Sequence, residues 1–378
     1  MKKTLAALAV LGAFAGSAMA ADVTLYGAVD TGFAYKHSKS TGEQAVDTFE
    51  MTSGWDTASK FGLKGSEDLG NGYKVSFKLE NGFDSDSGKF TQENRLFGRE
   101  AGLTLSGPFG SIAFGRFGGI SSSCGTYDML GYVESFDGGD GDVWGFAASS
   151  RYDNMVVYQT PRVAGLQATV QYSFKTDSSA KSSAFNGDEG TSNAERYASI
   201  GLSGEYGPAS FAVGYELTKY GSNEGADTVT NPARKLVDED GHLVFVGGNY
   251  DFEVVQVFAE AQYFKGQTSI GAGSLENGEF GNENTKGLKG YGLHLGAAAP
   301  IAAGTLTTGL YYVDGSAEYE DSNDDVDFKY YGVSARYNYP LSARTGVYFG
   351  AGYGQTKDEE DNSKDQITQV YCGLVHTF

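Results

Sequence analysis

Apolar and polar residues alternate along much of the chain. Residues 166–174 place Leu, Ala, Val, Tyr and Phe at the even positions and Gln, Thr, Gln and Ser at the odd positions. Residues 73–80 repeat the alternation, with Lys74, Lys78 and Glu80 on the polar side. The side chains of a strand point alternately to its two faces, so each such strand has one apolar and one polar face. Closing these strands into one sheet gives an outer surface suited to lipid and an inner surface suited to water.

Short and long connections alternate between these strands. Seven short connections are rich in turn-forming residues, at 68–72, 107–110, 161–165, 207–208, 251–253, 300–304 and 339–343. The long connections are polar and acidic, as at residues 177–193, 220–240 and 314–327. Seven short turns imply eight hairpins. We therefore predict an all-β fold, a transmembrane antiparallel β-barrel of 16 strands, the first from about Asp22 and the last ending at Phe378.

The first twenty residues have the pattern of a secretory signal peptide. Lys2 and Lys3 precede an apolar run over about residues 5–15, and residues 18–20 (AMA) have the small-x-small pattern of a cleavage site. The run is too short to cross roughly 30 Å of hydrocarbon as a helix, which disfavours a membrane anchor. We expect residues 1–20 to be removed during export and residues 21–378 to form one barrel domain.

Composition fits an exported barrel and excludes one class of partner. Gly accounts for 55 of the 378 residues and Pro for only 6, so few ladder hydrogen bonds are lost to Pro. Without Lys2 and Lys3, 26 basic and 48 acidic side chains give a net charge of −22, and we expect no nucleic-acid partner. We expect Cys124 and Cys372 to be free, because Cys124 falls in a long loop and Cys372 on the lipid-facing side of the last strand.

Five short motifs occur in order along the chain. They lie at residues 23–27 (VTLYG), 59–70 (SKFGLKGSEDLG), 96–101 (LFGREA), 114–116 (FGR) and 373–378 (GLVHTF). In this order and spacing the chain resembles the general, non-specific porins of Gram-negative outer membranes, nearest to the betaproteobacterial-type branch. The resemblance covers essentially the whole chain after residue 20. It implies a water-filled channel in the cell outer membrane through which small hydrophilic solutes and ions diffuse.

In such porins the third extracellular loop folds back into the barrel, where its acidic residues face basic residues of the wall. The matching loop runs from Gly118 to Ser149. The resemblance implies that the acidic side of the constriction is formed by Asp128, Glu134, Asp137, Asp140 and Asp142. The Pro-Glu-Phe order familiar in enteric members is replaced here by Ser135-Phe136-Asp137, which leaves open whether Glu134 or Asp137 faces the lumen.

The basic wall carries over from the same resemblance. Lys60 stands where the family has Arg in a Ser-Arg-Phe-Gly pattern, and Arg99 matches the Arg before Ala101. Arg151 matches the Arg of an Arg-x-x-Asn strand start, and Arg116 is a further inward-facing candidate. Opposed acids and bases across a narrow pore create a transverse field that orients dipolar solutes.

Charge counting predicts a weak cation preference. Residues 117–150 contain the five carboxylates and neither Lys nor Arg, while Lys60, Arg99 and Arg151 oppose them from the wall. The acidic external loops then concentrate cations at the mouth of the pore. Passive diffusion requires no catalytic residue, cofactor or metal, and we expect none.

Three other functions stay open. A substrate-selective channel for a sugar or an organic ion would use the loop aromatics Tyr127, Tyr132 and Trp144. A barrel enzyme needs a nucleophile and a base, yet the chain has four His residues and neither a G-x-S-x-G nor an H-E-x-x-H motif. An ion-binding adhesin rests on the acidic residues 321–327, which lack the Gly and the distal Glu of a calcium loop.

The resemblance also implies partners. Phe378, in phase with Val370 and Leu374, resembles the C-terminal signal read by the outer-membrane barrel assembly machinery. The remaining expected partners are outer-membrane lipid, lipopolysaccharide and two further copies of the chain in a homotrimer.

Overall fold

The computed structural model describes residues 23–139, 141–178, 187–221, 237, 239–275, 285–319 and 325–378. The expected signal peptide (residues 1–20), Asp140 and most of the acidic segment 321–327 lie outside the described residues. Within these ranges, no helix has the length and apolar character needed to cross a membrane.

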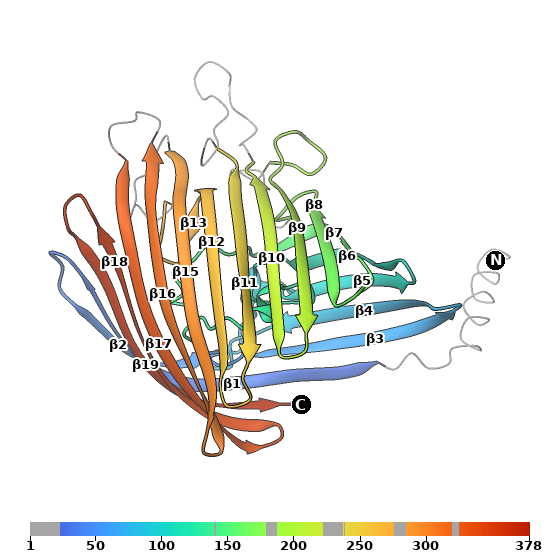
Figure 1. Ribbon diagram of the computed structural model, residues 1–378, viewed down its shortest axis with the longest axis horizontal. Coiled ribbons are helices and arrows are strands. Elements are labelled where there is room, and N and C mark those ends of the chain that lie inside the picture. The colour runs from blue at the N-terminus through green and yellow to red at the C-terminus, as the bar shows by residue number, and fades with distance from the viewer. Residues whose placement is uncertain are drawn as a thin grey trace, which may run out of the picture.

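Seventeen of the described strands form one closed antiparallel sheet (Figure 1). They are β1 (Thr24–Ser40), β2 (Val46–Ser53), β3 (Lys60–Gly70), β4 (Tyr73–Gly82), β5 (Glu100–Gly107), β6 (Gly110–Gly118), β7 (Arg151–Gln159), β8 (Leu166–Ser173), β9 (Arg196–Tyr206), β10 (Ala209–Lys219), β11 (Gly241–Asp251), β12 (Gln256–Gln267), β15 (Thr285–Ile301), β16 (Gly304–Tyr319), β17 (Val326–Ser342), β18 (Thr345–Asp358) and β19 (Lys364–Thr377). Because β2 and β3 both pair with β1, they are two parts of one wall strand. The wall therefore has sixteen strands, as predicted.

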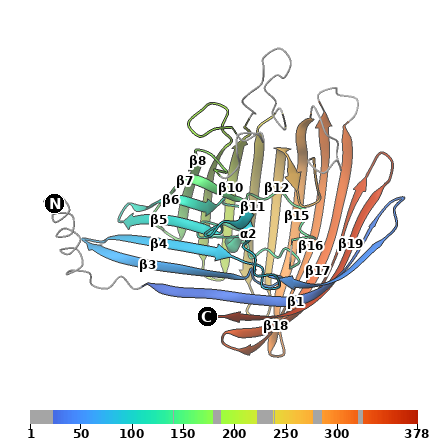
Figure 2. The same ribbon diagram turned by 180° about the vertical axis from the view of Figure 1, so that it is seen from behind.

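The seven predicted short turns all join neighbouring strands at one end of the barrel, and the long connections lie at the other end (Figure 2). The turn between β3 and β4 shows why these residues were informative. Asn71 and Gly72 have φ angles of 53° and 80°, the left-handed conformation that a two-residue hairpin requires. Four short elements lie within the long connections: α2 (Thr91–Asn94), η1 (Leu130–Tyr132), β13 (Ser269–Ile270) and β14 (Gly273–Ser274).

The distribution of side chains is the reverse of that in a water-soluble protein. On β8, Val170 is 43% exposed, whereas the polar neighbours Thr169 and Gln171 are each 1% exposed. On β17 the apolar Val333 is exposed and Ser334 is buried. Water is an unfavourable surrounding for such an outer face and lipid is a favourable one, so the alternation seen in the sequence is confirmed as a membrane-facing pattern.

The wall is not equally tall around the barrel (Figures 1 and 2). β5, β6, β7 and β8 contain 8 or 9 residues each. β15 to β19 contain 14 to 17 residues each. One side of the barrel is therefore low and the opposite side is high.

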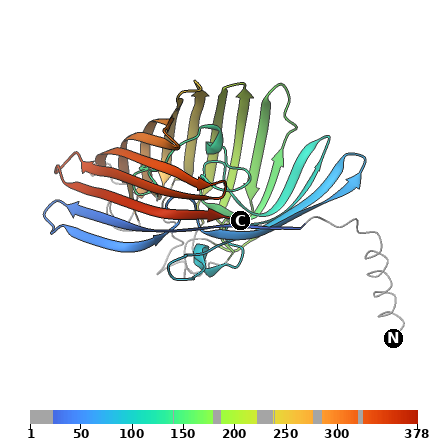
Figure 3. The ribbon, with the colours of Figure 1, turned by 90° about the horizontal axis from the view of Figure 1, so that it is seen from below.

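The first and last strands, β1 and β19, close the barrel (Figure 3). β19 pairs with β1 from Ala28↔Thr377 to Ser40↔Asp365. Beyond this ladder, the backbone N–H of Phe378 donates to the carbonyl of Gly27 and the N–H of Gly27 donates to that of Phe378, both at 3.0 Å. A Cβ atom at Gly27 would lie 2.4 Å from Cζ of Phe378, so glycine leaves the room that the terminal ring fills.

Deletion of Phe378 should reduce the fraction of folded barrel. The deletion removes two backbone hydrogen bonds, worth about 1 kcal/mol each, and uncovers Gly27. The measurement is the heat-modifiable band on a gel, with Phe378→Tyr as the control that keeps the ring and both bonds. A defect in cells with normal refolding in detergent would assign the effect to recognition by the assembly machinery, and wild-type folding in both settings would contradict the prediction.

Candidate functional site: the pore constriction

The connection between β6 and β7, residues 119–150, is held against the inner faces of distant wall strands. We call it the constriction loop. Its first and last parts share one buried partner, because the N–H of Ser121 (2.9 Å) and the hydroxyl of Ser149 (3.1 Å) both donate to Glu216 on β10. On the opposite side of the barrel, Tyr371 on β19 donates to the carbonyl of Gly138 at 2.6 Å. The loop therefore crosses the lumen.

Aromatic packing holds the second half of this loop. Trp144 and Phe146 pack on His294, with ring centroids 5.3 Å and 6.3 Å away, and His294 stacks on Tyr311 at 4.7 Å. Tyr311 also donates to the carbonyl of Phe136 at 2.5 Å. These rings are buried, so this side of the loop is fixed to β15 and β16.

A second connection lies on the constriction loop. The hairpin of β13 and β14 donates two backbone hydrogen bonds to it, from Gly271 to Phe146 (2.9 Å) and from Ala272 to Gly145 (3.1 Å). Thr356 on β18 donates to the carbonyl of Ala272 at 2.9 Å. The hairpin thus connects the constriction loop to β18.

A water-accessible cavity of about 770 Å³ remains between the loop and the wall. Six of the nine predicted site residues line it together: the basic Lys60, Arg99 and Arg151, and the acidic Asp128, Glu134 and Asp137. Both candidates for the lumen-facing acid, Glu134 and Asp137, therefore lie at the same cavity.

The three basic residues differ in how their charges are compensated. Nε of Arg99 lies 2.7 Å from Oε1 of Glu80, which is buried, and Tyr26 donates to the other Glu80 oxygen at 2.8 Å. Lys60 and Arg151 have no ion pair and no side-chain hydrogen bond within the part of the chain that the structure describes. These two wall cations thus line the cavity without a direct ion-pair partner among the described residues.

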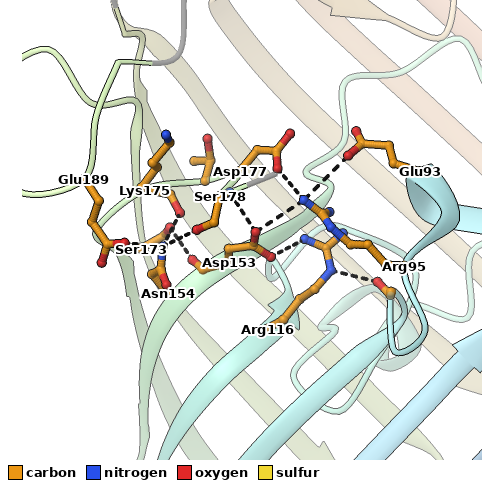
Figure 4. A network of polar contacts seen from close by, with 12 residues as sticks. Glu93, Arg95, Arg116, Asp153, Asn154, Ser173, Lys175, Asp177, Ser178 and Glu189 are labelled. Atoms are coloured by element: carbon orange, nitrogen blue, oxygen red, sulfur yellow. Dashed lines mark hydrogen bonds and ion pairs between the residues drawn. The ribbon is translucent and has the colours of Figure 1, made fainter. Parts of the chain in front are cut away.

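Arg116 lies apart from this wall, and its prediction as a member is not supported. The β6–β7 pairing shifts between Gly115 and Phe117, and Arg116 pairs with Ala101 on the face of β5 that also carries the exposed Leu103. Its guanidinium bonds Asp153 (2.6 Å) and the carbonyl of Gly98 (2.8 Å) (Figure 4).

The network around Arg116 ties two long connections to the outside of the barrel (Figure 4). Arg95, from the connection after β4, lies 3.3 Å from Asp153 and also pairs with Asp177, from the connection after β8. The N–H of Ser178 donates to Asp153 at 2.8 Å. Arg116 is therefore part of a structural link near the rim.

Two predicted acids are not part of the described cavity. Oδ2 of Asp142 lies 2.5 Å from Nζ of Lys36 and borders a smaller cavity of about 270 Å³ beside Ser38 and Thr356. Asp140 lies outside the described residues. Asp142 thus forms an ion pair with a side chain of β1 and does not line the cavity at the constriction.

Two residues at the cavity were missed by the sequence reasoning. Arg336 on β17 lines it, and so does Asp56, from the segment between β2 and β3. Their side chains pair, with Nη2 of Arg336 3.3 Å from Oδ1 of Asp56. Arg336 stands on the polar phase of β17 with Ser334 and Asn338, which is a signal that could have identified it.

The cysteines lie on different sides of the wall. Cys124 lines the cavity, whereas Cys372 pairs with Phe33 and Phe349, both of which are exposed on the outer face. Both are free in the structure.

Comparison with known proteins agrees with this architecture. Residues 6–362 match the family of Gram-negative porins. An outer membrane porin protein of Bordetella pertussis is 34% identical, with both chains covered over their full length. Outer membrane porin protein 32 of Delftia acidovorans is 30% identical over 99% of this chain and 95% of its own. Among solved structures, an anion-selective porin from Comamonas acidovorans superposes with a TM-score of 0.66 at 22% identity, covering 95% of this chain and 100% of its own.

The sixteen-stranded barrel with its apolar outer face is the architecture expected for a protein of the outer membrane. The match to the porin family covers most of the chain and runs from before the first strand to the last hairpin. Its relatives are themselves described as outer membrane porins. The chain belongs to the Gram-negative porin family and resides in the outer membrane.

Proposed function

We propose that this porin is a water-filled channel for passive diffusion of small hydrophilic solutes and ions. The observation that carries the proposal is the cavity of about 770 Å³ inside the barrel, where Lys60 and Arg151 on the wall share the lining with Glu134 and Asp137 on the loop. Opposed charges across a narrow passage order the water and orient dipolar solutes. A polar solute can replace the hydrogen bonds of the ordered water that it displaces, whereas an apolar solute cannot.

We propose a weak cation preference. Within the described lining, four cations (Lys60, Arg99, Arg151 and Arg336) meet four carboxylates (Asp56, Asp128, Glu134 and Asp137). Glu80 behind Arg99 adds a fifth carboxylate. The constriction is thus close to neutral, and the surplus of acidic residues elsewhere in the chain favours cations. The anion-selective porin from Comamonas acidovorans has the opposite preference, so the sign must be measured.

The second candidate is a channel selective for organic anions. It is favoured by the uncompensated charges of Lys60 and Arg151 at one cavity. A sugar channel has less support, because Tyr127 and Trp144 are buried in packing contacts and present no aromatic surface to the lumen.

We propose no catalytic activity. The inward-facing His294 is 3% exposed, and its Nδ1 lies 3.0 Å from the carbonyl of Leu310. Its Nε2 lies 3.4 Å from the N–H of Phe136. A general base needs a free nitrogen within reach of a substrate. His294 is instead a support for the constriction loop.

We also propose the partners that the family resemblance implies. These are small solutes and ions, outer-membrane lipid, lipopolysaccharide, the barrel assembly machinery and a homotrimer, without nucleic acid, cofactor or metal. The apolar outer face supports lipid contact and equally allows contact with another barrel. Conductance that closes in steps of three in a planar bilayer would support the trimer.

Neutralising the two sides of the constriction should shift ion selectivity in opposite directions. Lys60→Ala and Arg151→Ala remove uncompensated cations and should move the reversal potential in a salt gradient toward cations. Glu134→Gln and Asp137→Asn should move it toward anions. The exposed Glu43→Gln is the control that changes one charge away from the cavity. Shifts of the same sign from both sets would refute the assignment, and absence of any conductance in the wild type would refute the channel.

Selectivity should also depend on pH. Burial raises the pKa of the Asp128 carboxyl to about 6, although the backbone N–H of Leu130 donates to it at 2.9 Å. Burial likewise raises the pKa of the Glu134 carboxyl. A carboxyl with a raised pKa takes up its proton at a higher pH, so the lumen loses negative charge as the pH falls from 7 to 5.

We therefore expect the cation preference to fall over this range with a midpoint near pH 6. The measurement is the reversal potential at constant salt as a function of pH. Asp128→Asn should remove most of the change, because the amide does not titrate. A midpoint near pH 4 in the wild type, or an unchanged profile in Asp128→Asn, would contradict the role of Asp128.

A further inference from the structure

The second wall strand contains more residues than its pairing requires. Thr31 pairs with Ser53 on β2, and Ala28 pairs with Lys60 on β3. Two residues of β1 therefore lie opposite six residues of the partner, 54–59. An ordinary β-bulge adds one residue. This segment adds four, and we call it the inward bulge (residues 54–59).

The inward bulge faces the pore. Gly54, Asp56, Thr57 and Ala58 line the same cavity as the constriction loop. Trp55 and Ser59 are buried, at 5% and 2% exposure. The segment thus takes up space at the lumen from the wall side, next to the part of the loop around Phe136.

One buried carboxylate holds the bulge in place. Asp30 on β1 is fully buried, and one of its oxygens accepts the N–H groups of Asp56 (2.8 Å) and Thr57 (2.9 Å). Its other oxygen accepts the hydroxyl of Tyr348 at 2.6 Å. The Ser59 hydroxyl donates to the Asp30 carbonyl at 3.0 Å. Charge-assisted bonds of this kind are among the strongest in proteins, so the segment is fixed.

The bulge also meets the constriction loop through one side chain. Arg336 donates to the carbonyl of Trp55 (3.2 Å) and pairs with Asp56, while Asn338 donates to the same Asp56 oxygen at 2.5 Å. The guanidinium of Arg336 lies over the ring of Phe136, 4.9 Å from its centroid. Arg336 therefore contacts both inward segments.

We propose that the inward bulge is a second constriction element and that Asp56 is a specificity-determining residue of the pore. The bulge sets part of the free cross-section independently of the loop. Asp56 neutralises Arg336 at the cavity, so that this arginine does not add a third uncompensated cation to Lys60 and Arg151. The inference rests on the channel proposed above.

The main test shortens the bulge. Deleting residues 55–58 removes the four extra residues, which leaves Gly54 opposite Asp30 and Ser59 opposite Val29. Since an even number is removed, Lys60 stays opposite Ala28 on the inner face. We expect single-channel conductance in planar bilayers to rise roughly 1.5-fold, because conduction follows the pore diameter, and larger polyethylene glycols to enter. Unchanged conductance and an unchanged size limit in a folded, heat-modifiable variant would overturn the proposal.

A second variant removes charge without removing volume. Asp56→Asn should leave the conductance close to wild type and shift the reversal potential toward anions, because Arg336 loses its neutralising partner. Asp86→Asn is the matched control, the same chemical change at an exposed residue outside the cavity. A shift no larger than that of the control would overturn the role of Asp56, even if the deletion variant does not fold. A wild type that does not conduct would instead refute the channel, so the two failures are distinguishable.

Discussion

The constraint on which this structure depends is that lipid offers no partner for a backbone N–H or C=O group. A sheet that closes on itself pairs these groups between neighbouring strands and leaves no open edge. The ladder between β1 and β19 completes this closure, and the bonds between Phe378 and Gly27 extend it to the last residue. Irregular backbone is confined accordingly. The constriction loop and the inward bulge both lie on the water-filled side, where unpaired groups meet water or wall side chains.

The wet interior creates a second requirement, since charged side chains there are partly shielded from water by the loop. Most of them are used to hold the structure. Glu80 fixes Arg99, Glu216 fixes both parts of the constriction loop, and Asp30 fixes the inward bulge. Lys60 and Arg151, which have no ion pair among the described residues, act on passing ions more strongly than a paired cation. The number of charges in the lumen is therefore a poor guide to the field, and their pairing is a better one.

The sequence predicted the fold well because the two-residue period and the turn residues each follow from local geometry. These two local features were enough to predict the number of strands, the positions of the short turns and the closing role of the last strand. Arg151 lines the cavity although the β6–β7 register shifts only a few residues beyond it. Periodicity alone does not place the other residues near the constriction. Arg116 is in phase with the exposed Phe114, so the alternation itself places it on the outer face, whereas the four extra residues of the inward bulge have no pattern that separates them from an ordinary strand. Asp142 and Lys36 are 106 residues apart, so their pairing depends on tertiary structure.

The unequal height of the wall has a consequence for the approach of solutes. A strand needs roughly 9–11 residues to cross the membrane, so β5 to β8, with 8 or 9 residues each, only just approach this length. The strands β15 to β19 continue for about five residues more, which at about 3.4 Å per residue and a tilt of about 45° raises that side by about 12 Å. This exceeds the screening length of about 8 Å at physiological salt. Charges at the top of the high side are thus electrically separate from the constriction, while those on the low side are close to it. The pore has a sloping entrance, and an approaching ion passes the charges of the high side before it reaches those of the low side beside the constriction.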